Sequence, residues 1–219
     1  MLDVYQFVSG PLVWCAFIIF IGGSLYRLIS LLVLVHRKER FIYSYMSWKY
    51  SLRSILRWST PFATENMRRH PGMTIVTFAF HICLLLTPLF LLAHIILIEE
   101  AWNMSWWALP DGLADTMTLI VIAGCIFFFA RRLTNPEVQY VTSASDFILL
   151  AIVVAPFVTG FLAYYQWFGY QFFVILHILS GEIMLVAIPF TRLSHMLTAP
   201  LTRAYMGSEF GGVRRARDW

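Results

Sequence analysis

Four histidines lie inside strongly apolar stretches of this chain of 219 residues. His81 and His94 share one stretch, and His177 and His195 lie along another. An imidazole in hydrocarbon is costly, so it usually binds or relays something. The second pair is 18 residues apart. At ~100° per residue that is about five turns, which places both rings on one face of a helix. The rise of roughly 27 Å predicts one ring near each surface of a bilayer.

The composition is that of a membrane protein. Hydrophobic residues make up 59% of the chain and charged residues 13%, with a mean hydropathy of +0.71. A soluble core could not cover so much apolar surface. The net charge of +4 does not indicate a nucleic-acid partner, because the basic residues follow the membrane topology.

The three cysteines do not indicate a covalently attached cofactor. All of them lie in apolar runs and are interpreted as small buried hydrophobes; they are Cys15, Cys83 and Cys125. The chain has no C-x-x-C-H motif for covalent haem attachment. Three scattered thiols also cannot hold an iron–sulfur cluster, which takes four ligands, so any such centre belongs to a partner.

The apolar runs predict an all-α integral membrane protein, a five-helix transmembrane bundle forming a single domain over residues 1–219. Each run is about long enough to cross a bilayer as a helix, and only helices or closed barrels satisfy the backbone in lipid. The predicted spans are residues 12–35, 73–98, 113–130, 147–165 and 172–193.

The basic residues orient these spans. All 16 Lys and Arg residues fall on one side of the predicted topology, in the 36–70 segment, the link between spans three and four, the 197–219 tail and the adjacent helix ends. The positive-inside rule makes that side cytoplasmic. We therefore expect the amino terminus outside and the carboxyl terminus in the cytoplasm of a multi-pass bacterial inner-membrane protein.

An amphipathic segment is predicted over residues 41–58. Its apolar residues recur at steps of three and four, and three basic residues lie between them. The apolar set is Phe41, Tyr45, Trp48, Leu52 and Ile55, and the basic set is Lys49, Arg53 and Arg57. Such a helix lies on the cytoplasmic interface, where it either contacts anionic lipid or docks a partner subunit.

Topology constrains how the histidines pair. Span two runs outward and span five inward, so His81 and His195 lie toward the cytoplasm, and His94 and His177 lie toward the outside. Two bis-histidine sites stacked across the membrane follow. Haem iron accepts two imidazoles from facing helices, which makes these four residues candidate ligands of two haem b irons.

His94 needs a change of helical phase to face span five. It follows His81 by 13 residues, which separates the rings by ~140° on a straight helix. Pro88 lies between them and can kink the helix. The alternative is that His94 is a polar residue making a hydrogen bond near the outer interface.

Other polar residues in or near the spans have candidate roles. Haem propionates need cationic partners near the membrane surface, and the candidates, each equally an ordinary positive-inside anchor, are Arg27, Arg131, Arg132 and Arg192. Glu182 is a lone carboxylate in an apolar span. It acts either in a proton relay near a quinone or in a neutral packing hydrogen bond.

Several motifs resemble one known family. The segment Leu176–Pro200, with His-x17-His and Pro-Phe-Thr-Arg-Leu, resembles the last helix of the gamma (cytochrome b) subunit of respiratory nitrate reductase. Further similar motifs are Ile21–Ser24 with Arg27, Phe80-His81-Ile82, Arg131-Arg132-Leu133 and Ser143–Asp146. The resemblance covers nearly the whole chain.

The resemblance implies a five-helix dihaem cytochrome b that exchanges electrons with quinone. His81 and His195 match the family's inner-haem ligands, and His177 matches one outer-haem ligand. The family's fourth ligand falls at Leu91, so His94 must substitute, or the outer haem is altered or missing. The family's lysine near the start of span three, linked with quinol binding, is not found, and Ala114 and Asp115 occupy that region.

The long basic 36–70 segment and the chain length resemble a narrower group. These are the cytochrome b subunits of transmembrane redox complexes of sulfate-reducing bacteria, such as the high-molecular-weight cytochrome c (Hmc) complex. That resemblance implies as partners a periplasmic multihaem cytochrome c, iron–sulfur subunits and a second membrane subunit.

The favoured function is a membrane electron conduit. Two haems would carry electrons between a quinone, such as menaquinone, or a periplasmic cytochrome c and cytoplasmic iron–sulfur partners. The chain would then be the electron-transfer subunit of an oxidoreductase complex, with quinone reductase or quinol oxidase activity where it handles quinone. The alternatives are a haem-free membrane anchor and a proton- or ion-conducting subunit that uses the intramembrane His and Glu residues.

Overall fold

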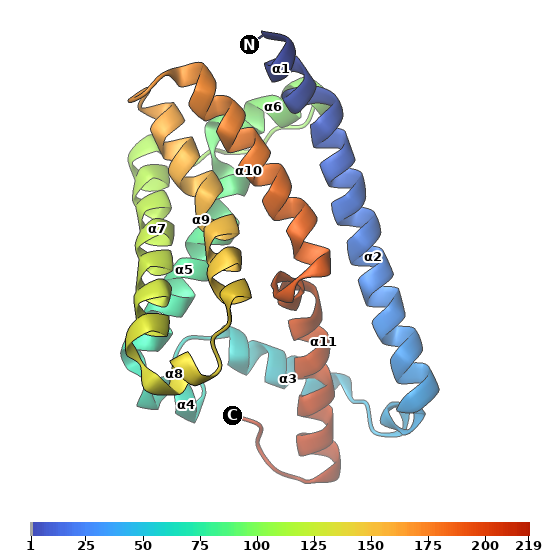
Figure 1. The fold of residues 1–219 in the computed structure, drawn as a ribbon. Helices are drawn as coiled ribbons and strands as arrows, with labels where there is room; N and C mark the ends of the chain where they lie inside the picture. Colours follow the sequence, from blue (N-terminus) through green and yellow to red (C-terminus); the bar gives the residue numbers. More distant parts are fainter. Residues whose placement is uncertain (1) are drawn as a thin grey trace. The chain divides into compact units, whose positions relative to one another are not determined.

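The computed structural model describes residues 2–219, and the regular structure in that range is entirely helical (Figure 1). Within it, five helices are long and apolar enough to cross a membrane. Both findings agree with the expected all-α chain and its five spans. The chain divides into two compact units, one of residues up to Ser9 and Ile75–Gly181, the other of Gly10–Thr74 and Glu182–Trp219.

The first unit contains most of the membrane-length helices. Its elements are α1 (Leu2–Phe7), α5 (Pro71–Phe90), α6 (Leu92–Trp102), α7 (Asp111–Thr134), α8 (Pro136–Tyr140) and α9 (Ala144–Tyr164). The first turn of α5, up to Thr74, belongs to the second unit. The helix α10 (Tyr170–Phe190) begins in this unit and ends in the second. Gly169, at φ +95°, makes the turn before α10, in the left-handed region that favours glycine.

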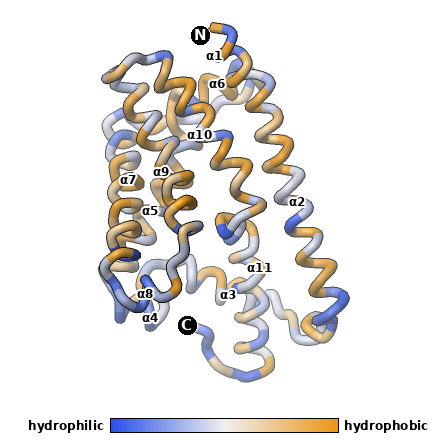
Figure 2. Tube along the Cα trace, in the orientation of Figure 1, coloured by the Kyte–Doolittle hydropathy of each residue, from blue (hydrophilic) through white to orange (hydrophobic). Residues whose placement is uncertain are grey.

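The second unit contains one long apolar helix and a group of shorter ones. Its elements are α2 (Val13–Lys38), a 3₁₀ turn (Arg40–Ser44), α3 (Trp48–Ser59), α4 (Glu65–Arg69), a second 3₁₀ turn (Arg192–Ser194), α11 (His195–Ser208) and a π-helical turn (Glu209–Val213). Figure 2 shows α2 as a largely hydrophobic tube that becomes hydrophilic at its C-terminal end, where His36, Arg37 and Lys38 lie.

Small residues let the helices of the first unit approach closely. A Cβ on Gly124 of α7 would lie 2.8 Å from the ring of Phe80 on α5. The ring of Phe80 packs edge-on against Phe128 with centroids 5.2 Å apart. At the start of α9, the backbone N–H of Ser143 donates to Asp146 at 2.9 Å, which satisfies one of the unpaired donors of that helix end.

In the second unit, α3 and α11 cross in close contact (Figure 1). The contact is made by small buried residues, since a Cβ on Gly207 would lie 2.5 Å from the Cβ of Ser54. The hydroxyl of Ser51 lies 2.9 Å from that of Ser208 and donates to the carbonyl of Ala204 at 3.1 Å. These polar groups are therefore satisfied between the two helices rather than by water.

The amphipathic segment differs from the expectation. The helix begins at Trp48 rather than at residue 41, because the preceding residues form a 3₁₀ turn and Ser47 is extended. The face that α3 buries against α11 carries Ser51 and Ser54, and not the apolar stripe. Of that stripe, Trp48 is 84% and Leu52 is 52% exposed. The apolar face of α3 therefore points away from the rest of its unit.

Candidate functional site

His94 of α6 and His177 of α10 face each other within the first unit. Their ring centroids lie 5.8 Å apart, and their planes are inclined by only 14°. Both side chains are half-buried. The structure thus brings together the two residues that the sequence analysis paired at the outer site.

His94 reaches this position because the second apolar stretch is not one helix, as expected over residues 73–98. The helix α5 ends at Phe90, Leu91 is extended (φ −74°, ψ 127°), and α6 begins at Leu92. Pro88 lies in the last turn of α5 and has no N–H to continue the helix. The break at Leu91 supplies the change of direction that a straight helix lacks.

The break leaves carbonyl groups at the end of α5 without helical hydrogen-bond donors. Three of these carbonyls accept hydrogen bonds from residues later in the chain. The bonds run from His94 Nδ1 to Pro88 O (2.9 Å), from Trp106 Nε1 to Leu89 O (2.8 Å) and from the Leu109 N–H to Phe90 O (2.8 Å). The interruption that moves His94 therefore also fixes the orientation of its ring.

His177 is oriented by α9. Its Nδ1 donates to the carbonyl of Pro156 at 2.8 Å. One turn later, Gly160 leaves room for the ring, because a Cβ there would lie 2.9 Å from both Cε1 and Nδ1 of His177. The ring is thus held directly against the α9 backbone.

All four candidate histidines show the same hydrogen-bond pattern at Nδ1. His81 bonds the carbonyl of Thr77 at 2.8 Å, and His195 bonds that of Arg192 at 2.9 Å. A carbonyl only accepts, so in each neutral ring Nδ1 carries the proton and Nε2 keeps the lone pair. Metal-ligating histidines usually donate their second N–H in this way, because it fixes the tautomer and the ring direction.

His81 and His195 belong to different units. In the first unit, the ring of Phe80 packs edge-on against His81, with centroids 5.2 Å apart. Phe80 can lie close against α7 because Gly124 has no side chain that would clash with its ring. In the second unit, His195 is the first residue of α11 and is exposed.

The expectation that His177 and His195 leave one face of a continuous helix is wrong. The helix α10 ends at Phe190 and is followed by a 3₁₀ turn before α11 begins at His195. Thr191 is extended (φ −121°, ψ −174°), and its hydroxyl accepts the N–H of Leu193 at 3.2 Å. The direction of His195 is therefore set by this interruption and not by the helical phase of α10.

Of the four candidate propionate partners, Arg132 is already engaged. Its guanidinium lies 3.1 Å from a carboxylate oxygen of Asp146, which is 5% exposed, and donates to the hydroxyl of Thr142 at 3.2 Å. These contacts join the end of α7 to the start of α9. Arg132 thus has protein partners of its own in the first unit.

The other three arginines differ in exposure. Arg131 is half-buried beside Arg132 and, within residues 2–219, forms no ion pair. Arg27 is exposed on α2, and Arg192 is exposed in the 3₁₀ turn before His195. Arg131 therefore lies at the end of α7 in the first unit, while Arg27 and Arg192 belong to the second unit.

Glu182 is a buried carboxyl group in the middle of α10. It is 7% exposed, and neither of its oxygens has a hydrogen-bond partner within the described part of the chain. A buried charge without a partner is strongly disfavoured. Neither of the two roles predicted for Glu182, in a proton relay or in a packing hydrogen bond, is shown by a contact within residues 2–219.

Asp115 lies near the start of α7, where the sequence analysis found no lysine. The hydroxyl of Tyr165 donates to Asp115 at 2.6 Å. This hydrogen bond to a carboxylate raises the pKa of Tyr165. Asp115 thus has a fixed partner at this end of α7.

The His94 and His177 imidazoles are ligands of the kind that a haem iron accepts. Residues 2–219 contain no group of three or more His, Cys, Asp or Glu side chains that would hold a metal ion by themselves. A haem iron needs only axial protein ligands, because the porphyrin supplies the others. His94 and His177 would be the residues that hold such an iron, each through Nε2, since Nδ1 of each ring bonds a backbone carbonyl.

Gly160 gives a test of the His177 position. We expect Gly160→Ala to displace the ring, because the new Cβ would lie 2.9 Å from it, and to lower haem content by up to one haem per polypeptide. The matched control is Gly181→Ala on α10, where an added Cβ meets nothing within 4 Å. Equal haem content and equal visible spectra in both variants would contradict the role assigned to Gly160.

Sequence reasoning missed Pro156 and Gly160. Both lie in the fourth apolar span, four residues apart and hence on one helix face. Glycine and proline are common in membrane helices, so their presence alone gave little signal. A pattern of both on one face was the cue that a neighbouring ring could approach that backbone.

Comparisons with known proteins agree with this architecture. The model of the nitrate reductase gamma subunit family matches residues 6–171, which include His81 and His94. The chain is also similar to a protein of Nitratidesulfovibrio vulgaris (strain Hildenborough). The two are 37% identical over 220 residues, which cover 97% of each chain.

Proposed function

Because the chain belongs to the nitrate reductase gamma subunit family, whose members are membrane cytochrome b subunits of redox complexes, we propose that it binds two haems b and carries electrons across the membrane. The haems supply one-electron chemistry when bound, while the protein supplies axial ligands, an apolar surrounding and charge near the propionates.

The observation that carries the proposal is the geometry of His94 and His177. Their ring centroids lie 5.8 Å apart in nearly parallel planes, and each Nδ1 bonds a backbone carbonyl, which leaves Nε2 to ligate an iron. The candidate ligands of the second haem are His81 and His195, which have the same Nδ1 pattern. This second pairing rests on the predicted topology.

The positive-inside rule assigns the His94 and His177 pair to the outer leaflet and the His81 and His195 pair to the cytoplasmic leaflet of a bacterial inner membrane. Arg27, Arg131 and Arg192 are the candidates for the inner propionates.

The electron route would connect a quinone or an outer cytochrome with cytoplasmic iron–sulfur partners. Glu182 is the candidate to take up or release the proton that quinone chemistry requires, because its carboxyl group is buried and unpartnered in the described chain. A periplasmic multihaem cytochrome c and a second membrane subunit would complete such a complex.

A reduced-minus-oxidised visible spectrum of the purified protein, together with its haem-to-polypeptide ratio, tests the proposal. We expect b-type bands and a ratio of about two, one for each pair of imidazoles. A haem-free anchor and a proton-conducting subunit both predict no b-type bands, so the absence of these bands would overturn the proposal. A ratio of one would retain the cytochrome and remove one of the two sites.

A further inference from the structure

The helix α3 has three distinct faces. Ser51 and Ser54 are buried against α11. At ~100° per residue, Arg53 and Arg57 share a second face, and Leu52 and Leu56 lie between that face and the exposed apolar side. Leu56 is 65% exposed. An exposed apolar face beside a basic one is typical of helices that lie at a lipid surface.

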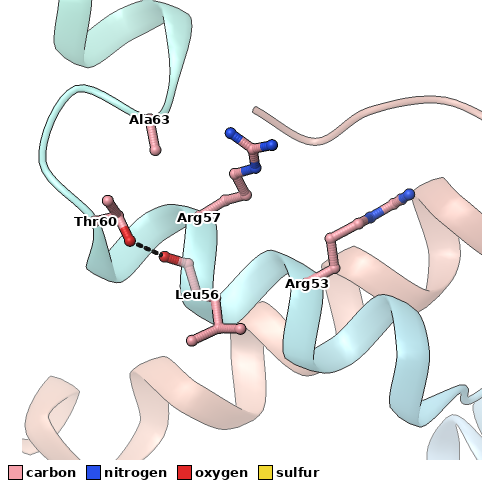
Figure 3. A pocket seen from close by; sticks show the side chains of 5 residues that line it. All are labelled: Arg53, Leu56, Arg57, Thr60 and Ala63. Carbon is pink, nitrogen blue, oxygen red and sulfur yellow. Dashed lines mark hydrogen bonds between the residues drawn. The ribbon is translucent and has the colours of Figure 1, made fainter.

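The basic face borders a pocket of about 230 Å³ (Figure 3). Its lining has no acidic side chain and consists of Arg53, Leu56, Arg57, Thr60 and Ala63. Figure 3 shows the side chains of Arg53 and Arg57 extending to the same side of α3. A water takes about 30 Å³ of liquid volume, so the pocket has room for a group as large as a phosphate.

Both guanidinium groups are held in place by stacking. The Cζ atoms of Arg53 and Arg57 lie 4.6 and 5.4 Å from the centre of the Trp219 ring, and Arg53 also lies 4.8 Å from that of Tyr50. Such contacts orient a guanidinium without neutralising it. Both guanidinium groups thus lie beside the Trp219 ring.

The lining of the pocket carries two positive charges and no negative one. Within residues 2–219, neither Arg53 nor Arg57 forms an ion pair, and Arg53 Nε is buried without a hydrogen-bond partner. One carboxylate oxygen of the nearby Asp218 accepts a hydrogen bond from the hydroxyl of Ser54, and its other oxygen is also buried without a partner in the described residues. A single carboxylate does not offset the two guanidinium groups. A buried donor left unpaired is costly, which points to an anion that completes the site.

We propose that this pocket binds the phosphate of an anionic phospholipid. The guanidinium fork matches phosphate oxygens, and the exposed Leu52 and Leu56 offer a surface for the lipid chains beside it. The helix α3 lies between the membrane-length helices α2 and α5 in the sequence, which keeps it near the bilayer. The proposal is independent of haem binding.

The test uses the full chain purified in detergent and depleted of lipid, with phosphatidylglycerol as the probe and native mass spectrometry as the readout. We expect one tightly retained lipid, and about tenfold weaker retention in Arg57→Gln, because a charge-assisted hydrogen bond is lost. The matched control is Lys49→Gln, which removes the same charge from α3 outside the pocket. It should change retention by less than about twofold.

Two further measurements keep the result decisive. Arg57→Lys preserves the charge but not the fork, so it should bind more weakly than the unchanged protein, and far-ultraviolet circular dichroism checks that each variant is folded. Equal losses in Lys49→Gln and Arg57→Gln would mean diffuse attraction and overturn the proposal. Displacement of the lipid by millimolar inorganic phosphate would make the site one for free phosphate, which also overturns it.

Discussion

His94→Ala is expected to lower the haem-to-polypeptide ratio from about two to about one, with the remaining haem keeping its spectrum. His94 faces His177 with ring centroids 5.8 Å apart, and haem iron with a single imidazole in an apolar pocket loses half of its axial protein ligation. The measurement is haem content by extraction, combined with the reduced-minus-oxidised spectrum.

His70→Ala serves as the control for this variant. His70 is exposed at the C-terminal end of α4, directly before α5, so its removal should leave both haems in place. His177→Ala should lose the same spectral component as His94→Ala. Unchanged haem content in His94→Ala would mean that another residue ligates the outer iron.

His195→Ala is expected to remove the other haem and retain the one bound by His94 and His177. The Nδ1 of His195 bonds the carbonyl of Arg192, which leaves Nε2 as the ligating atom. The effect should again be one haem of two. Low-temperature spectra, in which the two b-type components separate, would show which of them is lost.

The companion variant His81→Ala tests the pairing across the two units. If His81 and His195 hold one iron, each single variant and the double variant should all lack the same component. Loss of different components from His81→Ala and His195→Ala, or retention of both haems in either variant, would contradict the pairing.

The sequence predicted the helices better than their interruptions. Long apolar runs identify membrane-length helices, because satisfying the backbone in lipid allows few alternatives. The break at Leu91 was signalled only by Pro88, and a proline does not by itself tell whether a helix bends or ends. The break after Phe190 also follows a proline, Pro189, which lies inside α10 near its end.

For the candidate site, the four histidines could be found from the sequence because imidazoles in apolar runs are rare. Their hydrogen-bond acceptors could not, since a backbone carbonyl has no residue type. Pro156 lies in a different span from His177 and becomes its acceptor only when α9 and α10 pack. The fit of Gly160 against the ring depends on the same packing.

The α3 helix shows the same limit at longer range. Its apolar periodicity predicted an amphipathic element, but the face that packs is the one with Ser51 and Ser54. That choice depends on Gly207, more than 150 positions later in the chain, which lets the two backbones approach. Periodicity describes one helix and cannot identify a distant partner made of small residues.

The backbone acceptors at His94 and His177 bear on electrochemistry. A carbonyl oxygen accepts a hydrogen bond but takes up no proton in the physiological range, so it offers the Nδ1–H group of these rings no base to which a proton could move. In the proposed cytochrome, these two ligands would not couple electron uptake to proton uptake. The midpoint potential of that haem would then vary with pH only through more distant groups, such as the carboxyl group of Glu182.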